Sequence, residues 1–255
     1  MLKSLERAHD PCKTDLREGP TRPIWHAGKE RTLRALFWVA LSSALLLSAF
    51  AADAPVSTVF TPRSSTFLKL LAVYASKAGE GWVIAAVGAV ASLLLFLRRR
   101  FSASLSVFFV AATGLLTGAA ATIIRSLLGR TRPTSHELQG FYGVWHDSHW
   151  IIGKYEFGAF PSGHAATVIG LATAAWLIDR RLGTLAALYA LLVSWSRIAL
   201  GCHHFSDVVA AGILGIYGAQ LISARLGPSV YSLGQSLQSA WLARKQALGS
   251  SPEEG

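Results

Sequence analysis

Three arginines near the ends of apolar stretches, Arg125, Arg132 and Arg197, carry the first chemical signal in this sequence. A guanidinium group pairs with two phosphate oxygens at once and keeps its charge at any physiological pH. In a phosphoryl-transfer transition state charge spreads over the equatorial oxygens, so preorganised cations stabilise that state. Arg197 lies within an apolar run, where an unpaired charge is costly and a partner anion is expected. For Arg125, Arg132 and the Arg130 between them, a second interpretation stays open, in which they end a membrane helix at the interface.

A second signal is the stretch Pro161-Ser162-Gly163-His164, which opens an apolar segment. The beginning of a helix presents free N–H groups and the positive end of the helix dipole to an anion. Ser162 suits the N-cap position, and Gly163 lets the backbone approach a ligand closely. His164 can face the same anion and protonate a leaving alkoxide. Taken alone, such a stretch is more typical of an ordinary capped helix.

The third signal is the pair His203 and Asp207, four residues apart and preceded by Ser196 and Arg197. At that spacing a carboxylate can fix the imidazole tautomer through one ring N–H and leave the other nitrogen as a nucleophile. A His/Asp pair of this kind is often structural, so the three signals gain weight only from occurring together. The neighbouring His204 is expected to serve packing or head-group contact.

The composition indicates an integral membrane protein. Of the 255 residues, 52% are hydrophobic and only 15% are charged, whereas soluble domains carry about 25% charged residues. The formal net charge is +10, but the basic residues stand at segment ends and in the three signals. Nucleic-acid binding is therefore not expected.

Six apolar blocks have lengths near those of membrane-spanning helices. They occupy residues 35–52, 81–97, 103–124, 163–178, 183–200 and 207–224. The sequence therefore predicts an all-α bundle of six transmembrane helices. The shorter apolar stretch Thr66–Ala75 predicts an interfacial or re-entrant helix before the second span. We divide the chain into a cytoplasmic tail (1–34), a six-span membrane domain (35–225) and a second cytoplasmic tail (226–255).

The distribution of basic residues predicts the orientation. With six spans and the N-terminus inside, 16 of the 24 lysines and arginines lie on the cytoplasmic side, as the positive-inside rule requires. Four of the remaining eight, Arg125, Arg130, Arg132 and Arg197, belong to the chemical signals. All three signals then lie at the outer face, which in a bacterial inner membrane is the periplasmic face.

The three signals together resemble the type 2 phosphatidic acid phosphatase superfamily of membrane phosphatases. That family's pattern is Lys-x6-Arg-Pro, then Pro-Ser-Gly-His, then Ser-Arg-x5-His-x3-Asp. The second and third motifs match here at every defined position, and the first matches at Arg132 and Pro133. Arg125 stands where the family has lysine, which keeps the charge but changes the donor geometry. The resemblance covers about residues 66–224.

The resemblance implies a role for each motif residue and a lipid phosphate in the bilayer as substrate. His203 is the expected nucleophile that forms a phosphohistidine, Asp207 orients it, and His164 is the general acid. The residues expected to hold the phosphate are Arg125, Arg132, Ser162, Gly163 and Arg197. The resemblance implies neither a metal nor any other cofactor. It leaves open whether the lipid is undecaprenyl diphosphate, phosphatidylglycerol phosphate, phosphatidic acid or lipid A, and it does not specify the oligomeric state.

Two further functions share these residues. A phosphotransferase would pass the phosphate to another lipid instead of water, and only acceptor-dependent turnover distinguishes it. A lipid-phosphate binder or transporter would need neither His203 nor Asp207, which argues against that class. The aromatic loop 134–160 either seats itself among the lipid head groups or acts as a lid that selects them. Its residues His146, Asp147 and His149 give only a weak metal signal.

Overall fold

The computed structural model describes residues 24–60 and 65–249, and the chain divides into two units at Ser43. The first described helix, α1 (Ile24–Ala51), begins within the segment predicted as a tail. Its portion Leu33–Ala51 is long and apolar enough to cross a membrane. The rest of the predicted tail, residues 1–23, lies outside the described residues.

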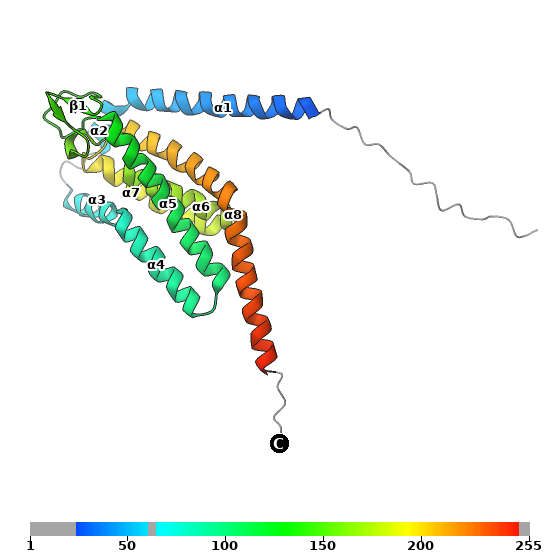
Figure 1. Cartoon of the computed structure of the whole chain (residues 1–255). Coiled ribbons are helices and arrows are strands. Elements are labelled where there is room, and N and C mark those ends of the chain that lie inside the picture. Colours follow the sequence, from blue (N-terminus) through cyan, green and yellow to red (C-terminus); the bar gives the residue numbers. More distant parts are fainter. Residues whose placement is uncertain (1–23, 61–64, 250–255) are drawn as a thin grey trace, which may run out of the picture. The chain divides into compact units, whose positions relative to one another are not determined.

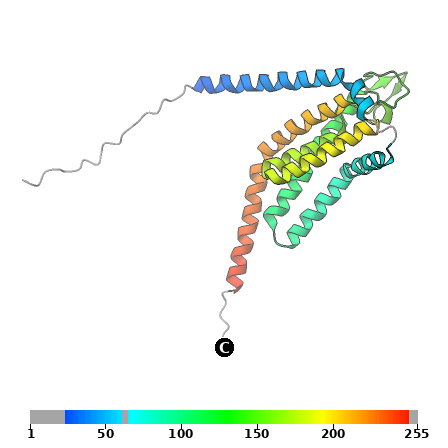
Figure 2. The same cartoon turned by 180° about the vertical axis from the view of Figure 1, so that it is seen from behind.

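The second unit, residues 44–255, is built from helices that run side by side (Figures 1 and 2). Helix α6 packs against α5, α7 and α8, while α4 lies against α5 and α3 against α7. The bounds are α2 (Asp53–Phe60), α3 (Thr66–Ala78), α4 (Gly81–Leu97), α5 (Phe101–Leu128), α6 (Gly163–Ile178), α7 (Arg180–Ala199) and α8 (Phe205–Gly249). Small residues allow this close packing. A Cβ at Gly118 of α5, for example, would collide with the Thr167 side chain of α6.

The helices support a multi-pass membrane protein, while six spans remain a prediction. Four helices of the described ranges are long and apolar enough to cross a membrane, or five if α3 and α4 form one span bent by 61°. Helix α6 is apolar but has 16 residues, slightly fewer than the usual range for a span. The interfacial position expected for residues 66–75 also remains a prediction, although these residues are helical as expected.

Helix α8 runs without a break from Phe205 to Gly249 and so includes most of the predicted C-terminal tail. Pro228 lies inside it, and α8 changes direction part-way along (Figure 1), as helices do at proline. The tail prediction rested on falling hydropathy alone. In the structure this part of α8 is held by the start of α5, where the Phe101 amide donates to Gln238 Oε1.

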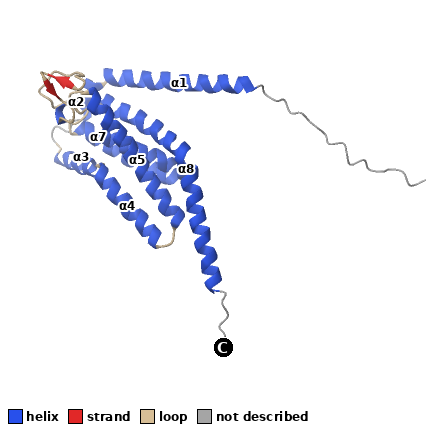
Figure 3. Ribbon diagram, in the orientation of Figure 1, coloured by secondary structure: helices blue, strands red, loops and turns tan. Residues whose placement is uncertain are grey.

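The segment between α5 and α6 is mostly irregular and lies at one end of the bundle. It contains the two-stranded hairpin β1 (Trp145–His146) and β2 (His149–Trp150), shown in red in Figure 3, and the 3-10 helix η1 (Tyr155–Phe157). The all-α prediction therefore missed one small sheet. Helix α5 ends at Gly129, whose φ of 59° is in the left-handed region that glycine tolerates. A Cβ there would collide with the Gly143 carbonyl.

Candidate active site

His203 lies in the short connection between α7 and α8, and only 2% of its surface is exposed. Its Nδ1 lies 2.7 Å from the Ala159 carbonyl oxygen. Because a carbonyl oxygen only accepts, Nδ1 carries the proton and Nε2 keeps its lone pair. Burial lowers the pKa of His203 from its ordinary value to about 4, opposed by Asp207 and reinforced by Arg132 and Arg197. The ring is therefore neutral at physiological pH, as a nucleophile must be.

Nε2 of His203 is buried and has no hydrogen-bond partner among the described residues. A buried polar atom without a partner is costly, so this nitrogen is available to an incoming group. The resemblance assigned the orientation of the ring to Asp207. In the structure Ala159 holds Nδ1 more closely, since Asp207 Oδ2 lies 3.5 Å from the same nitrogen. The carboxylate acts here as a second, longer-range neighbour.

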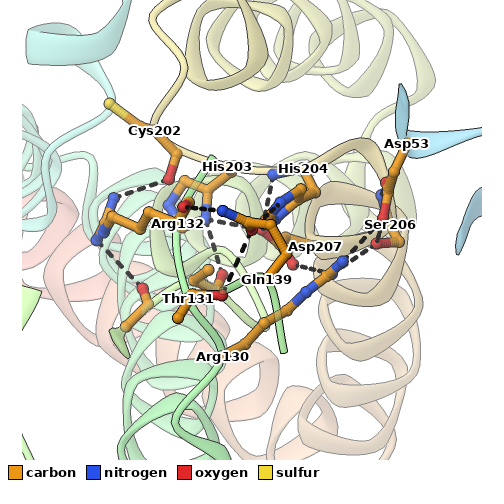
Figure 4. A network of polar contacts seen from close by, with 12 residues as sticks. Asp53, Arg130, Thr131, Arg132, Gln139, Cys202, His203, His204, Ser206 and Asp207 are labelled. Carbon is orange, nitrogen blue, oxygen red and sulfur yellow. Dashed lines mark hydrogen bonds and ion pairs between the residues drawn. The ribbon is translucent and has the colours of Figure 1, made fainter. Parts of the chain in front are cut away.

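Asp207 lies in the first turn of α8, and its side chain is completely buried. Oδ2 accepts from the His204 amide at 2.7 Å and lies 3.3 Å from His204 Nδ1. Oδ1 accepts from Arg130 Nη1 at 2.5 Å. Both oxygens are therefore held, as Figure 4 shows. His204 contributes to the site by fixing this carboxylate, a role that sequence analysis did not assign to it.

Arg132 and Arg197 are both buried beside His203, and their charges act on it. Arg132 donates to three backbone carbonyls, those of Tyr155 at 2.7 Å, Cys202 at 2.9 Å and Gly158 at 3.1 Å. Its guanidinium also lies 3.8 Å from the centre of the Tyr155 ring. These bonds fix the orientation of the cation and tie the irregular segment to the α7–α8 connection.

Arg197 lies in the last turn of α7 and donates through Nη1 to the Ser76 hydroxyl of α3. Its Nε is buried without a partner among the described residues. The apolar surroundings of Arg197 predict a partner anion, and Nε is a donor available to one. Ser76 is a neighbour that the sequence did not identify, because nothing in its spacing links α3 to α7.

Arg125, Gly163 and His164 line one cavity of about 260 Å³ between α5 and α6. A Cβ at Gly163 would lie 3.5 Å from Arg125 Nη1, so glycine leaves room for the guanidinium beside the start of α6. Ser162 is the N-cap of α6 as predicted, and its side chain accepts from the Ala165 amide. The charges of Arg125, Arg132, Arg197 and His203 all act on His164.

The structure thus gathers residues of all three motifs at one end of the bundle. The starts of α6 and α8 are joined directly, because the Ser162 amide donates to the Asp207 carbonyl at 3.1 Å. His203, Asp207, Arg132 and Arg197 are buried, while His164 and Arg125 are half-buried beside the cavity. The arrangement places one imidazole that can attack, one that can transfer a proton, and three guanidinium groups in the same region.

Arg130 is a member of the site for which the sequence, although it places this residue within the first motif, predicts no role of its own. It is buried, with hydrogen bonds to Asp207, Ser206 and Asp53. Its position two residues before Arg132 gave no indication of these partners. Asp53, at the start of α2, was not noted at all.

The aromatic loop places a different trio together from the one noted in the sequence. Glu137, His146 and Asp147 offer oxygen and nitrogen atoms within 4.8 Å of one another. His149 is not part of that group, and its Nδ1 lies 2.5 Å from the Asp147 carbonyl oxygen. Glu137 and Asp147 are exposed, and the His146 ring lies 4.1 Å from the Tyr142 ring with the planes tilted by 50°. An exposed loop adopts such an arrangement without an ion.

The motif-bearing part of the chain is similar to known proteins. The model of the PAP2 superfamily, whose members include the type 2 phosphatidic acid phosphatases, matches residues 103–229. This range includes all three motifs. The chain belongs to the PAP2 superfamily.

Two curated relatives of this PAP2 chain bear names of lipid phosphatases. It is 32% identical over 139 residues to the lipid A 4′-phosphatase of Bacteroides thetaiotaomicron. The matched residues make up 51% of this chain and 60% of the relative. It is 38% identical over 83 residues to the putative undecaprenyl-diphosphatase YbjG of Escherichia coli, which covers 31% and 41% respectively. The chain therefore spans less than two thirds of each relative's length. Among solved structures, LpxE of Aquifex aeolicus is 17% identical, with a TM-score of 0.47, covering 67% of this chain and 93% of that one.

Proposed function

We propose that this PAP2 chain hydrolyses the phosphate monoester or diphosphate of a membrane lipid through a phosphohistidine on His203. The observation that carries the proposal is the state of this ring. It is buried and neutral, Nδ1 is bonded to a carbonyl, and Nε2 has no partner among the described residues. A binding protein has no need of a buried, neutral imidazole whose Nε2 has no partner and whose neighbours include two arginines, Arg132 and Arg197.

In the proposed first step, the lone pair of His203 Nε2 attacks phosphorus and the bond from phosphorus to the leaving oxygen breaks. The leaving oxygen belongs to the lipid alcohol in a monoester and to the remaining lipid phosphate in a diphosphate. His164 gives its proton to the leaving oxygen. In the second step water attacks phosphorus, His164 takes a proton from it, and the bond to Nε2 breaks to release inorganic phosphate. Arg125, Arg132 and Arg197 hold the equatorial oxygens throughout, with Ser162 and Gly163 at the start of α6.

A second cavity supports a lipid as the carrier of the phosphate. It has about 530 Å³ and is lined mostly by apolar residues of α4, α5, α6 and α7, with Ala78 at the end of α3. Ile84, Ala111 and Leu171 line it about one helical turn beyond Gly81, Leu115 and Thr167, which line the cavity of Arg125 and His164. The apolar cavity therefore begins next to the polar one and continues toward the opposite end of α5. A phosphate in the first cavity would place a hydrocarbon chain in the second.

The test is phosphate release by the purified protein in detergent from four lipids: undecaprenyl diphosphate, phosphatidylglycerol phosphate, phosphatidic acid and lipid A. Each lipid is assayed with and without a second, unphosphorylated lipid as acceptor. We expect release into water from at least one of them, and none from His203→Ala. Turnover that requires the acceptor would assign a phosphotransferase. Saturable binding without release from any of the four would overturn the enzymatic function.

We further propose that the site faces the periplasm, on the strength of the basic-residue distribution. The turn of the β1–β2 hairpin, Asp147-Ser148, is exposed and suits an inserted reporter. A reporter that works only in the periplasm should be active at this turn and silent when fused after Ser250. The reverse pattern would place the site in the cytoplasm.

A further inference from the structure

Arg130 occupies a buried position in which each end of its guanidinium meets a carboxylate. Nη1 donates to Asp207 Oδ1 at 2.5 Å and to the Ser206 hydroxyl at 2.7 Å. Nη2 donates to Asp53 Oδ2 at 2.8 Å. Figure 4 shows the guanidinium between Asp207 on one side and Asp53 with Ser206 on the other. This bridge joins the irregular segment after α5 to the starts of α2 and α8.

Three phenylalanine rings surround the same guanidinium. The centres of the Phe50, Phe141 and Phe160 rings lie 4.8, 5.2 and 5.8 Å from its central carbon. Aromatic faces attract a cation and exclude water from it. With little water to compete, the bonds to the two carboxylates hold Arg130 in one orientation, and removing a partner from such a buried pair is strongly unfavourable.

Asp53 completes the arrangement from the start of α2. Its Oδ1 accepts from the Ser206 amide at 2.8 Å, and Oδ2 accepts from the Ser206 hydroxyl at 2.7 Å. It therefore satisfies a free N–H group at the beginning of α8, as an N-capping carboxylate does. One carboxylate thus fixes both Arg130 and the first turn of the helix that carries Asp207.

The charges of the three groups also have a consequence for His203. Arg130 alone would neutralise Asp207 and weaken its attraction for a positively charged imidazole. Asp53 balances Arg130, so the trio retains one net negative charge beside the ring. When Nε2 bonds to phosphorus, the ring gains positive charge, and this negative charge stabilises it.

We propose that Arg130, balanced by Asp53, is a positioning residue of the reaction: it holds the Asp207 carboxylate so that the carboxylate acts on His203. The inference rests on the proposed function, because it describes how the phosphohistidine is formed. Arg130 acts through another side chain and does not hold the phosphate. Its loss should consequently slow turnover without weakening substrate binding.

The experiment compares Arg130→Gln with the wild type on the best lipid substrate. We expect kcat to fall by about 10- to 100-fold and KM to change by less than about threefold. Arg130→Lys keeps the cation but cannot bridge both carboxylates in the same way, so its kcat should lie between the two. A rise in KM at constant kcat would mean that Arg130 binds the phosphate, and an unchanged kcat would mean that it has no role; either result overturns the inference.

Asp179→Asn is the matched control for a purely structural effect. Asp179 caps α7 by accepting from the Arg181 and Leu182 amides, at the end of α6 opposite His164. We expect it to lower the melting temperature and leave kcat within about twofold. If Asp179→Asn and Arg130→Gln lower kcat equally for equal losses of melting temperature, Arg130 is structural and the inference is wrong.

A second measurement asks whether Arg130 acts through Asp207. Arg130→Gln is repeated in the Asp207→Asn background, with excess enzyme and an activated aryl phosphate so that slow turnover is measurable. We expect a further loss below about threefold, because the carboxylate it would hold is gone. An equal loss in both backgrounds overturns the inference alone. Absence of turnover in the wild type would instead remove the proposed function and this inference with it.

Discussion

The His203 side and the His164 side of the candidate site are held in opposite ways. His203 is bonded to Ala159, and its neighbour Asp207 is fixed on both oxygens by Arg130 and His204. His164 and Arg125 lie beside a cavity, and no hydrogen bond or ion pair to another described residue holds either side chain. The comparison suggests that the protein preorganises the attacking group and leaves the proton donor and one cation for the substrate to complete.

The largest effect should come from His203→Ala, because it removes the atom that bonds to phosphorus. We expect kcat to fall by at least about 10⁴-fold, on the scale seen when a nucleophile is deleted. The melting temperature should change little in comparison, which differential scanning fluorimetry in detergent can check. Activity near the wild-type value would break the comparison, since the buried ring would then be structural.

His164→Ala should have a smaller effect that depends on the leaving group. With an ordinary lipid phosphate we expect a loss of about 10²- to 10⁴-fold in kcat. With an aryl phosphate whose leaving oxygen needs no proton, the rate of phosphoenzyme formation should remain close to that of the wild type. Single-turnover kinetics on both substrates measure the difference. Equal losses on both would show that His164 is not the proton donor.

The pH dependence should reflect the buried state of His203. Only the neutral ring has a lone pair on Nε2, so activity is present above its pKa and lost as the pH falls through it. With the pKa lowered to about 4, protonation of His203 should leave kcat/KM unaffected from pH 7 down to about 5. The substrate phosphate titrates near pH 6, so its ionisation is measured by phosphorus NMR and divided out. A remaining decline centred near pH 6.5 would indicate an exposed, ordinary histidine.

The smallest effect should come from Tyr155, which is exposed and contacts Arg132 through its ring. Tyr155→Phe keeps the ring and should leave kcat/KM within about twofold. Tyr155→Ala removes the cation–π contact and should lower it by about two- to fivefold, since such contacts are weak at exposed sites. Steady-state kinetics of the two variants side by side would sharpen the comparison. If Tyr155→Phe lowers kcat/KM by more than about twofold, the effect belongs to the hydroxyl, which donates to Cys202 Sγ.

Sequence alone could predict the motif residues because their types and order carry the chemistry. The cap at Ser162 and the helical character of the membrane segments followed from local rules. The residues that pair with the buried charged side chains could not be predicted from local rules. Asp53 and Arg130 are 77 residues apart, and no periodicity connects them. A carboxylate beside an apolar run, such as Asp53, is expected to have a polar partner. Only the folded structure, in which α2 packs against α8, identifies Arg130 and Ser206 as its partners.

The remaining differences have similar causes. The continuation of α8 to Gly249 is accompanied by a hydrogen bond from the start of α5 to Gln238, and hydropathy does not register such a contact. The bond between Ala159 and His203 involves a backbone carbonyl, so the identity of residue 159 does not predict it. The β1–β2 hairpin turns on Asp147 and Ser148, both with positive φ, a conformation that these residues adopt in the folded loop without a glycine to signal it.

The direct bond between the Ser162 amide and the Asp207 carbonyl has a consequence for the synthesis and membrane insertion of the protein. Translation proceeds from the N-terminus, and α8 is the last described helix to leave the ribosome. Until it inserts, Asp207 is missing, Arg130 lacks a carboxylate, and the start of α6 lacks its neighbour. The nascent chain can therefore pass its earlier helices through the insertion machinery, among lipids that carry phosphate, before it has a working site. The site therefore becomes complete only once α8 has been inserted.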